Sequence, residues 1–174
     1  MKSLQDRLWH RPERARTLAN RSLYAGAFVA TTLFGGSLFA MMLYTSASRA
    51  PQWELLFMRP PFNGGFTFFV MFNSLMEWLF LPAALFLNWR VPTRRRLLLA
   101  GAMVYYGARG WTYAYFVPEI FTLMATPADN PLSPDVVRRI AQWIHLSWIR
   151  CAVDGVLAFL LVFATAKPDA SIVA

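Results

Sequence analysis

Four long stretches of the chain are almost continuously apolar, at residues 22–46, 66–89, 97–123 and 140–166. A helix needs about 20 mostly apolar residues to cross the ~30 Å hydrocarbon core of a bilayer. The stretches do not alternate between apolar and polar residues, and each far exceeds the ~10-residue strands of membrane barrels. The pattern therefore predicts an all-α fold, an integral membrane bundle of four helices.

The polar segments between these stretches carry turn and capping signals. Pro60 and Pro61 precede the second stretch, and a basic turn around Pro92 separates the second from the third. Ser133 followed by Pro134 is typical of a helix N-cap and its first turn. We therefore expect a basic N-terminal segment at residues 1–21, a transmembrane domain at 22–166 and a short tail at 167–174.

Composition agrees with a membrane protein and argues against a nucleic-acid partner. Hydrophobic residues make up 57% of the chain and charged residues 15%, against about a quarter charged in soluble domains. The net charge is +8. The basic residues stand at the ends of the apolar stretches, however, and do not form a stripe on a folded surface. Their distribution is instead a topology signal, and the expected partner is the lipid bilayer.

Counting Lys and Arg gives the orientation. The N-terminal segment, the second connection and the tail together hold eleven, and the first and third connections hold four. Basic residues accumulate on the cytoplasmic side of membrane helices. The count predicts a multi-pass protein of the inner (cytoplasmic) membrane with both ends inside. A cleavable signal peptide is the competing interpretation, but the first apolar stretch is longer than its 7–15-residue core.

Neither a metal site nor a bound cofactor is expected. The single cysteine, Cys151, lies within an apolar stretch, so the chain has no internal disulfide and no Cys/His metal-binding spacing. His145 is the only histidine in a predicted span, and no Glu-x-x-His pair is present. Bis-histidine haem ligation and a di-iron carboxylate site are therefore excluded within this chain.

Four charged residues lie well inside the predicted spans, away from their ends: Glu77, Arg109, Arg150 and Asp154. At a rise of 1.5 Å per residue, Glu77, Arg109 and Asp154 reach similar depths near the middle of the bilayer. Two acids and two bases sum to zero charge, as a buried network requires. Arg150 and Asp154 can pair at i, i+4. These groups either hold the helices in register or line a polar pocket.

The pocket interpretation nominates specific side chains. Candidate acid–base groups are Glu77, Tyr113, His145 and Asp154. Candidate ligand-binding groups share the same depth or the same helix faces, and they are Asn73, Tyr105, Arg109, Tyr113, Trp143 and Arg150. An imidazole can serve as a proton shuttle, which makes His145 a candidate, but its place near a helix end equally suits an aromatic residue at the membrane interface.

The last two predicted helices also carry a family-like pattern. Val117-Pro118 closes the third helix, and Trp143 and Arg150 are spaced along the fourth. This pattern resembles the anthrone-oxygenase-like family of four-helix bacterial and fungal membrane proteins, most of them of unknown function. Ser147 and Ile120 depart from it, because the family often has asparagine at the first position and a polar residue at the second.

The resemblance implies oxidation of an electron-rich phenol without metal or flavin. Such a reaction needs a base and a cationic or tyrosyl anchor. Arg109, Arg150, Asp154, Glu77 and the tyrosines are the residues that would supply them.

Two classes of function follow from the sequence. The first is a membrane protein whose mid-membrane polar pocket binds a lipophilic aromatic or quinone-like molecule, with a cofactor-independent oxygenase as its catalytic form. The alternative is a non-enzymatic accessory subunit, held by a membrane protein partner or a second copy. A small transporter is a third option, weakened because no pair of predicted spans is interrupted at midplane in corresponding positions and no inverted repeat is seen. A cavity reaching Arg109 and Asp154 would favour the pocket, and fully paired charges without a cavity would favour the subunit.

Overall fold

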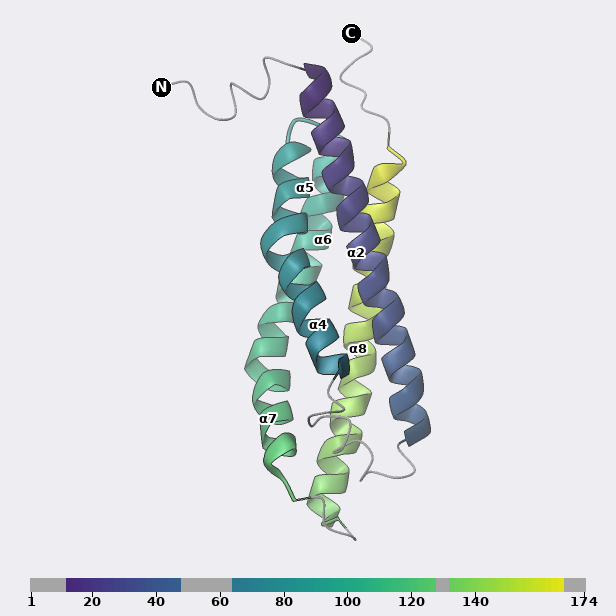
Figure 1. Cartoon of the computed structure of the whole chain (residues 1–174), viewed down its shortest axis with the longest axis vertical. Coiled ribbons are helices and arrows are strands. Elements are labelled where there is room, and N and C mark those ends of the chain that lie inside the picture. Colours follow the sequence, from purple (N-terminus) through teal and green to yellow (C-terminus); the bar gives the residue numbers. More distant parts are fainter. Residues whose placement is uncertain (1–11, 48–63, 128–131, 168–174) are drawn as a thin grey trace, which may run out of the picture.

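The computed structural model describes residues 12–47, 64–127 and 132–167, and within these ranges the chain is helical with no strand. The all-α prediction is confirmed. The elements are α2 (Pro12–Ala47), α4 (Gly64–Leu75), η1 (Met76–Phe80), α5 (Leu81–Leu87), α6 (Pro92–Trp111), η2 (Thr112–Phe116), α7 (Val117–Ala125) and α8 (Pro134–Thr165). Because η1 and η2 are π-helical turns that join their neighbours end to end, the elements form four rods (Figure 1).

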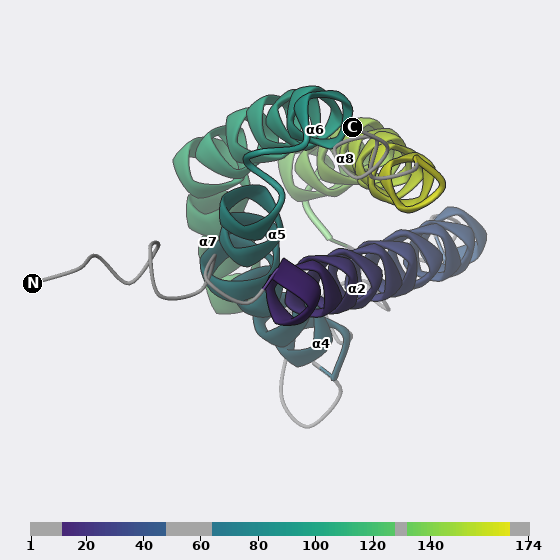
Figure 2. The same ribbon diagram turned by 90° about the horizontal axis from the view of Figure 1, so that it is seen from above.

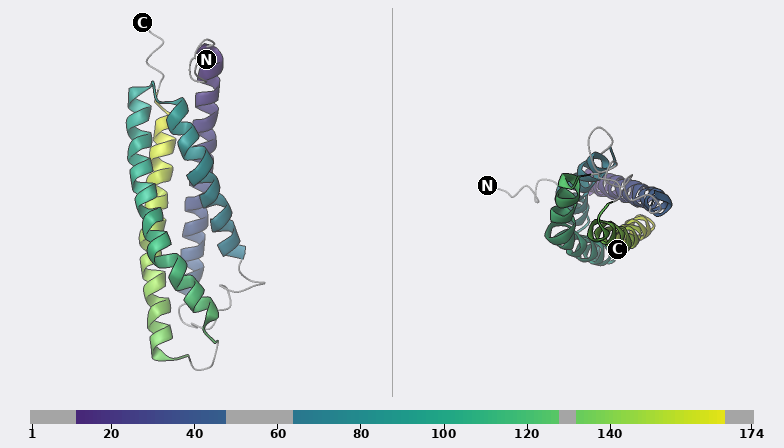
Figure 3. Two further views of the ribbon diagram at one scale, coloured as in Figure 1. Left: turned by 90° about the vertical axis from the view of Figure 1, so that its left-hand side faces the viewer. Right: turned by 90° about the horizontal axis from the view of Figure 1, so that it is seen from below.

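The rods lie side by side with alternating direction. α2 packs along α8, α6 packs on the other side of α8, and α5 packs on α2. The view along the rods shows them around a common centre (Figure 2). The start of α2 and the end of α8 lie at the same end of the molecule, while α4 leans away from the other rods near Gly64 (Figure 3).

Three of the rods are long and apolar enough to cross a membrane: Glu13–Thr45, Gly65–Leu87 and Pro134–Thr165. This supports a membrane protein. The helix predicted at 97–123 is present within Pro92–Ala125, but it does not reach the same hydropathy. Its arginines and tyrosines lower its apolar character. The first rod begins at Pro12, ten residues before the predicted span, because the apolar pattern gives no information about the polar first turns.

Two apolar clusters form the core and leave a gap between them along α8. One contains Leu33, Met76 and Leu157, and the other contains Phe116, Ile140 and Trp143. The face of α8 between these clusters, from Ser147 to Asp154, carries polar and charged side chains. The polar layer therefore lies inside the molecule with apolar packing on both sides.

The second and third rods each carry a π turn immediately before a proline. The N–H of Leu81 donates to the carbonyl of Met76, and the N–H of Val117 donates to that of Thr112. Pro82 and Pro118 follow directly. Proline lacks an N–H and clashes with the carbonyl four residues earlier in an α-helix, and the wider π turn accommodates it. Both rods remain helical through these turns, which widen the helices without breaking them.

A buried arginine ties the ends of the rods together near the termini. Arg94 is 5% exposed. Its Nε and Nη2 donate to the carbonyl oxygen of Lys167 at 3.1 and 2.9 Å, and its Nη1 donates to Oδ1 of Asn20 at 2.7 Å and of Asn88 at 3.2 Å. Arg94, which the sequence analysis counted only as a topology charge, thus joins α2, α6 and the C-terminal end of α8.

Candidate functional site

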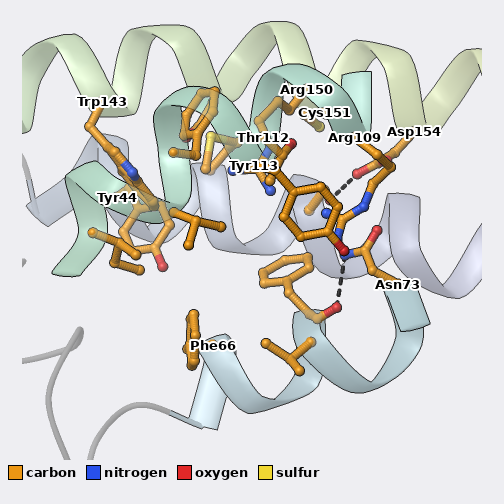
Figure 4. A pocket seen from close by; sticks show the side chains of 18 of the residues that line it. Tyr44, Phe66, Asn73, Arg109, Thr112, Tyr113, Trp143, Arg150, Cys151 and Asp154 are labelled. Carbon is orange, nitrogen blue, oxygen red and sulfur yellow. Dashed lines mark hydrogen bonds between the residues drawn. The ribbon is translucent and has the colours of Figure 1, made fainter. Parts of the chain in front are cut away.

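A cavity of about 290 Å³ lies between the four rods at the level of the polar layer. Every rod contributes to it, as the close-up shows (Figure 4). The lining residues are Ser37, Met41, Tyr44, Phe66, Phe69, Val70, Asn73, Ser74, Arg109, Thr112, Tyr113, Phe116, Val117, Ile120, Phe121, Trp143, Ser147, Arg150, Cys151 and Asp154.

Part of the cavity wall is exposed at the surface, on α4, η2 and α7. Three of its lining side chains are half exposed or more: Val70 (50%), Tyr113 (51%) and Phe121 (56%). These side chains come from α4, η2 and α7, on two different rods.

One wall holds a closed network around a buried ion pair. The Nε of Arg109 lies 3.1 Å from Oε2 of Glu77, and the two side chains are 14% and 8% exposed. The Tyr113 hydroxyl donates to Glu77 Oε2 at 3.1 Å and accepts from Arg109 Nη2 at 3.0 Å. The Arg109 guanidinium also lies 4.7 Å from the centre of the Tyr113 ring. The two charges neutralise each other, and the Tyr113 hydroxyl forms hydrogen bonds with both. These contacts hold the side chains of this wall in place without a ligand.

The π turn of the second rod leaves the Glu77 backbone carbonyl without a helical partner. In the i→i−5 pattern its donor would be the N–H of residue 82, and Pro82 has none. The Tyr106 hydroxyl donates to this carbonyl at 2.6 Å. Within a membrane, freed helix carbonyls need such a partner. Tyr106 thus stabilises the turn that positions the Glu77 carboxylate.

Asn73 is fixed by a buried tyrosine beneath the cavity. The Tyr105 hydroxyl lies 3.1 Å from both the backbone carbonyl and Oδ1 of Asn73. Tyr105 is only 1% exposed and belongs to the apolar core. It orients a lining residue from behind and does not itself line the cavity.

The pairing of Arg150 with Asp154 that their spacing allowed is not made within the described residues. Asp154 instead accepts a hydrogen bond from the hydroxyl of Ser37 on α2. The Arg150 guanidinium lies 4.4 Å from the centre of the Phe116 ring. The sequence could not reveal this because Ser37 and Phe116 lie on other rods, and their side chains compete with the partner on the same helix.

Two buried polar atoms in the cavity wall have no hydrogen-bond partner in the described part of the chain: Trp143 Nε1 and Ser147 Oγ. Trp143 is 6% exposed and Ser147 is 4% exposed. The Trp143 ring packs edge-on against Tyr44, with centroids 5.6 Å apart, and against Phe116 at 6.0 Å. Buried donors without partners are rare in folded proteins and call for an explanation.

Six of the nine side chains nominated from the sequence line the cavity, and they are Asn73, Arg109, Tyr113, Trp143, Arg150 and Asp154. Glu77 and Tyr105 stand behind the wall. His145 is exposed on α8 and does not line it, because it is two residues from both Trp143 and Ser147 and projects from another face.

Sequence reasoning missed every lining residue of the first rod and several of the third. Ser37, Thr112 and Phe116 line the cavity, but nothing in their sequence surroundings distinguishes them from packing residues. Cys151 also lines it, as a buried free thiol. No cluster of three or more His, Cys, Asp or Glu side chains is found among residues 12–47, 64–127 and 132–167.

Comparison with known proteins adds no family to this geometry. No protein-family model, no curated protein and no solved structure matches the chain. The cavity and the residues that form it are therefore the features of this chain that bear on its function.

Proposed function

We propose that the chain is a multi-pass inner-membrane protein that binds a lipophilic aromatic or quinone-like molecule in the cavity between its four helices. In this proposal the rods form a transmembrane bundle with both ends in the cytoplasm. The third rod crosses with its charges turned toward the other rods. Glu77 and Arg109 neutralise each other there, which lowers the cost of placing them in the bilayer.

One observation carries the binding proposal: the cavity combines aromatic walls with polar groups that have no partner of their own. Small-molecule sites are mostly apolar cavities of about 300–1,000 Å³ with a few polar groups that fix orientation. The volume of about 290 Å³ suits a molecule of one or two rings. Trp143 and Ser147 supply the unsatisfied polar groups.

The same observation weighs against the accessory-subunit alternative. A purely structural role predicts that the intramembrane charges pair with each other and that no cavity separates them. Arg109 and Glu77 meet that description, but Arg150 forms no ion pair with a described residue, and Arg150 and Asp154 both line the cavity. A protein that only bound a partner through an apolar face would have no use for the cavity or for the charges of Arg150 and Asp154 that line it.

A catalytic form of the proposal assigns the acid–base role to Asp154. Its carboxylate lines the cavity, and among the described residues its hydrogen-bond partner is Ser37. The Glu77 carboxylate is already occupied by Arg109 and Tyr113, and His145 faces away. If the protein oxidises a bound phenol, as the family resemblance implies, Asp154 is the base that the phenol would meet.

Native mass spectrometry of the protein, purified gently from its own membrane, tests the proposal. We expect a 1:1 adduct with a small aromatic or quinone-like molecule. Ser147→Leu fills the cavity and should abolish the adduct, while Ala152→Leu on the exposed side of α8 should retain it. Circular dichroism and thermal melts establish that both variants fold. Co-purification with larger subunits in a fixed ratio, without an adduct, would contradict the proposal.

A further inference from the structure

We infer that the ligand is uncharged and presents a carbonyl-type acceptor oxygen to one face of α8, formed by Trp143, Ser147 and Arg150. This inference rests on the proposed function and specifies the ligand's chemistry and orientation. The three residues are spaced four and three apart, so they share one stripe of the helix. All three line the cavity.

The stripe formed by Trp143, Ser147 and Arg150 presents hydrogen-bond donors that have no acceptor among the described residues. The indole N–H of Trp143 can donate but cannot accept. It is buried and unpartnered, as is the Ser147 hydroxyl. Leaving such groups unsatisfied costs more than an average hydrogen bond gains. Small rotations would turn these two side chains toward a ligand oxygen. The hydrogen bonds formed with that oxygen would remove the cost of leaving the donors unsatisfied.

Ser147 is unusual among the hydroxyls of these helices. Thr31, Thr32 and Thr112 each donate to the backbone carbonyl four residues earlier, at 2.8–2.9 Å. This is the usual partner of a helical hydroxyl. Ser147 has the same carbonyl available and does not bond to it. Its hydroxyl is therefore free to bond to a ligand without breaking an existing hydrogen bond.

Arg150 extends the donor stripe by one turn. Its guanidinium is held over the Phe116 ring at 4.4 Å, and no hydrogen bond or ion pair joins it to another residue of the described chain. A guanidinium has five N–H donors in a fixed plane. The contact with the ring uses no acceptor oxygen, so N–H groups of Arg150 remain available for an oxygen of the ligand.

The charges around the cavity favour a neutral ligand over an anionic one. Glu77 and Asp154 balance Arg109 and Arg150, so the site already sums to zero. A carboxylate would add an uncompensated negative charge beside Asp154 in a region of low dielectric, which is costly. A carbonyl oxygen satisfies the same donors and leaves the charge balance unchanged. The aromatic walls, with Tyr44 and Phe116 beside Trp143, suit a flat ring.

The test compares three probes built on one tetramethyl ring. Duroquinone carries two carbonyls, durene carries no oxygen, and 2,3,5,6-tetramethylbenzoate carries an anionic carboxylate. The ring of duroquinone is fully substituted, so it does not alkylate the Cys151 thiol in the wall. Binding is measured by calorimetry on protein in nanodiscs, with empty nanodiscs as the blank. We expect duroquinone to bind, and tetramethylbenzoate to bind at least tenfold more weakly.

Two variants assign the effect to the stripe. Trp143→Phe keeps a ring but removes the N–H, and Ser147→Ala removes the hydroxyl. Each should weaken duroquinone binding about three- to tenfold more than it weakens durene binding, which is the value of one hydrogen bond. Trp148→Phe, on the neighbouring exposed face, should change neither.

The outcomes separate this inference from the proposed function. Equal losses for duroquinone and durene in the Trp143 and Ser147 variants would mean that these donors do not recognise an oxygen, and would overturn the inference alone. Tighter binding of the benzoate would overturn the neutral-ligand argument. If none of the three probes binds to the wild-type protein and native mass spectrometry shows no adduct, the proposed function fails as well.

Discussion

The hydroxyl of Tyr113 donates to Oε2 of Glu77 across 3.1 Å, and each of these residues lies in a π-helical turn five positions before a proline. The two turns belong to adjacent rods that run in opposite directions. The Phe80-Leu81-Pro82 and Phe116-Val117-Pro118 sequences close them. The π turn that accommodates each proline thus also brings the side chains of Glu77 and Tyr113 together beside the cavity.

Tyr113→Phe should weaken this contact without unfolding the protein. The variant removes a hydroxyl that bridges Glu77 and Arg109, but the ion pair between those residues remains. We expect a loss of about 1 kcal/mol in stability, measured by thermal melts in detergent. Tyr24→Phe, at a side chain that is 59% exposed, is the control and should melt like the wild type. A loss above about 3 kcal/mol would show that the ion pair depends on the hydroxyl.

Tyr106→Phe should be destabilising because it leaves the Glu77 carbonyl without a donor. The expected cost is about 1–3 kcal/mol, the range for an unsatisfied buried polar group. Pro82→Ala supplies a backbone N–H in the same turn. A double-mutant cycle should therefore show a smaller cost of Tyr106→Phe when residue 82 is alanine. Additive effects of the two changes would contradict the account given for the π turn.

Breaking the buried ion pair on one side should cost more than replacing both partners. Glu77→Leu leaves Arg109 as an uncompensated buried charge, with an expected cost of about 3–5 kcal/mol. Combining it with Arg109→Leu should restore much of that stability, since an apolar pair of similar size suits this depth. Asp135→Asn at the exposed pair with Arg138 should cost at most about 1 kcal/mol. A double variant less stable than the single one would overturn this expectation.

Arg94→Lys tests the clamp near the termini without altering the charge count that sets topology. Lysine cannot reproduce the planar, multiply bonded contact of the guanidinium. We expect a loss of about 1.5–3 kcal/mol in unfolding experiments, with unchanged orientation. Arg96→Lys, at an exposed position of the same turn, should be neutral. Equal melting temperatures for the two variants would show that the clamp adds no stability.

The orientation in the membrane can be measured with reporter fusions. With both ends in the cytoplasm, a fluorescent protein at the C-terminus should fold and fluoresce, while alkaline phosphatase at that site should be inactive. Phosphatase inserted between Pro127 and Leu132, in the connection before α8, should be active. Replacing Arg94, Arg95 and Arg96 together by Gln should weaken this bias, because the positive charges set it. The opposite reporter pattern would overturn the assigned topology.

Sequence alone determined the helices and most of the polar groups. The length of the apolar stretches predicted the rods. Ser133 predicted the start of α8, where its hydroxyl accepts a hydrogen bond from the N–H of Val136 at 3.4 Å. Arg109, Arg150 and Asp154 were singled out because charged residues are rare in apolar stretches. These signals are local, because each depends only on residue type and spacing along one helix.

Only the tertiary structure decided which of these groups meet. Asp154 pairs with Ser37 and not with Arg150, Glu77 stands behind the wall, and Arg94 joins three rods. Such choices depend on the rotation and tilt of each helix against the others, which periodicity does not encode. The π turns made the largest difference, since adding one residue to a turn rotates everything beyond it and thereby sets which side chains face the cavity.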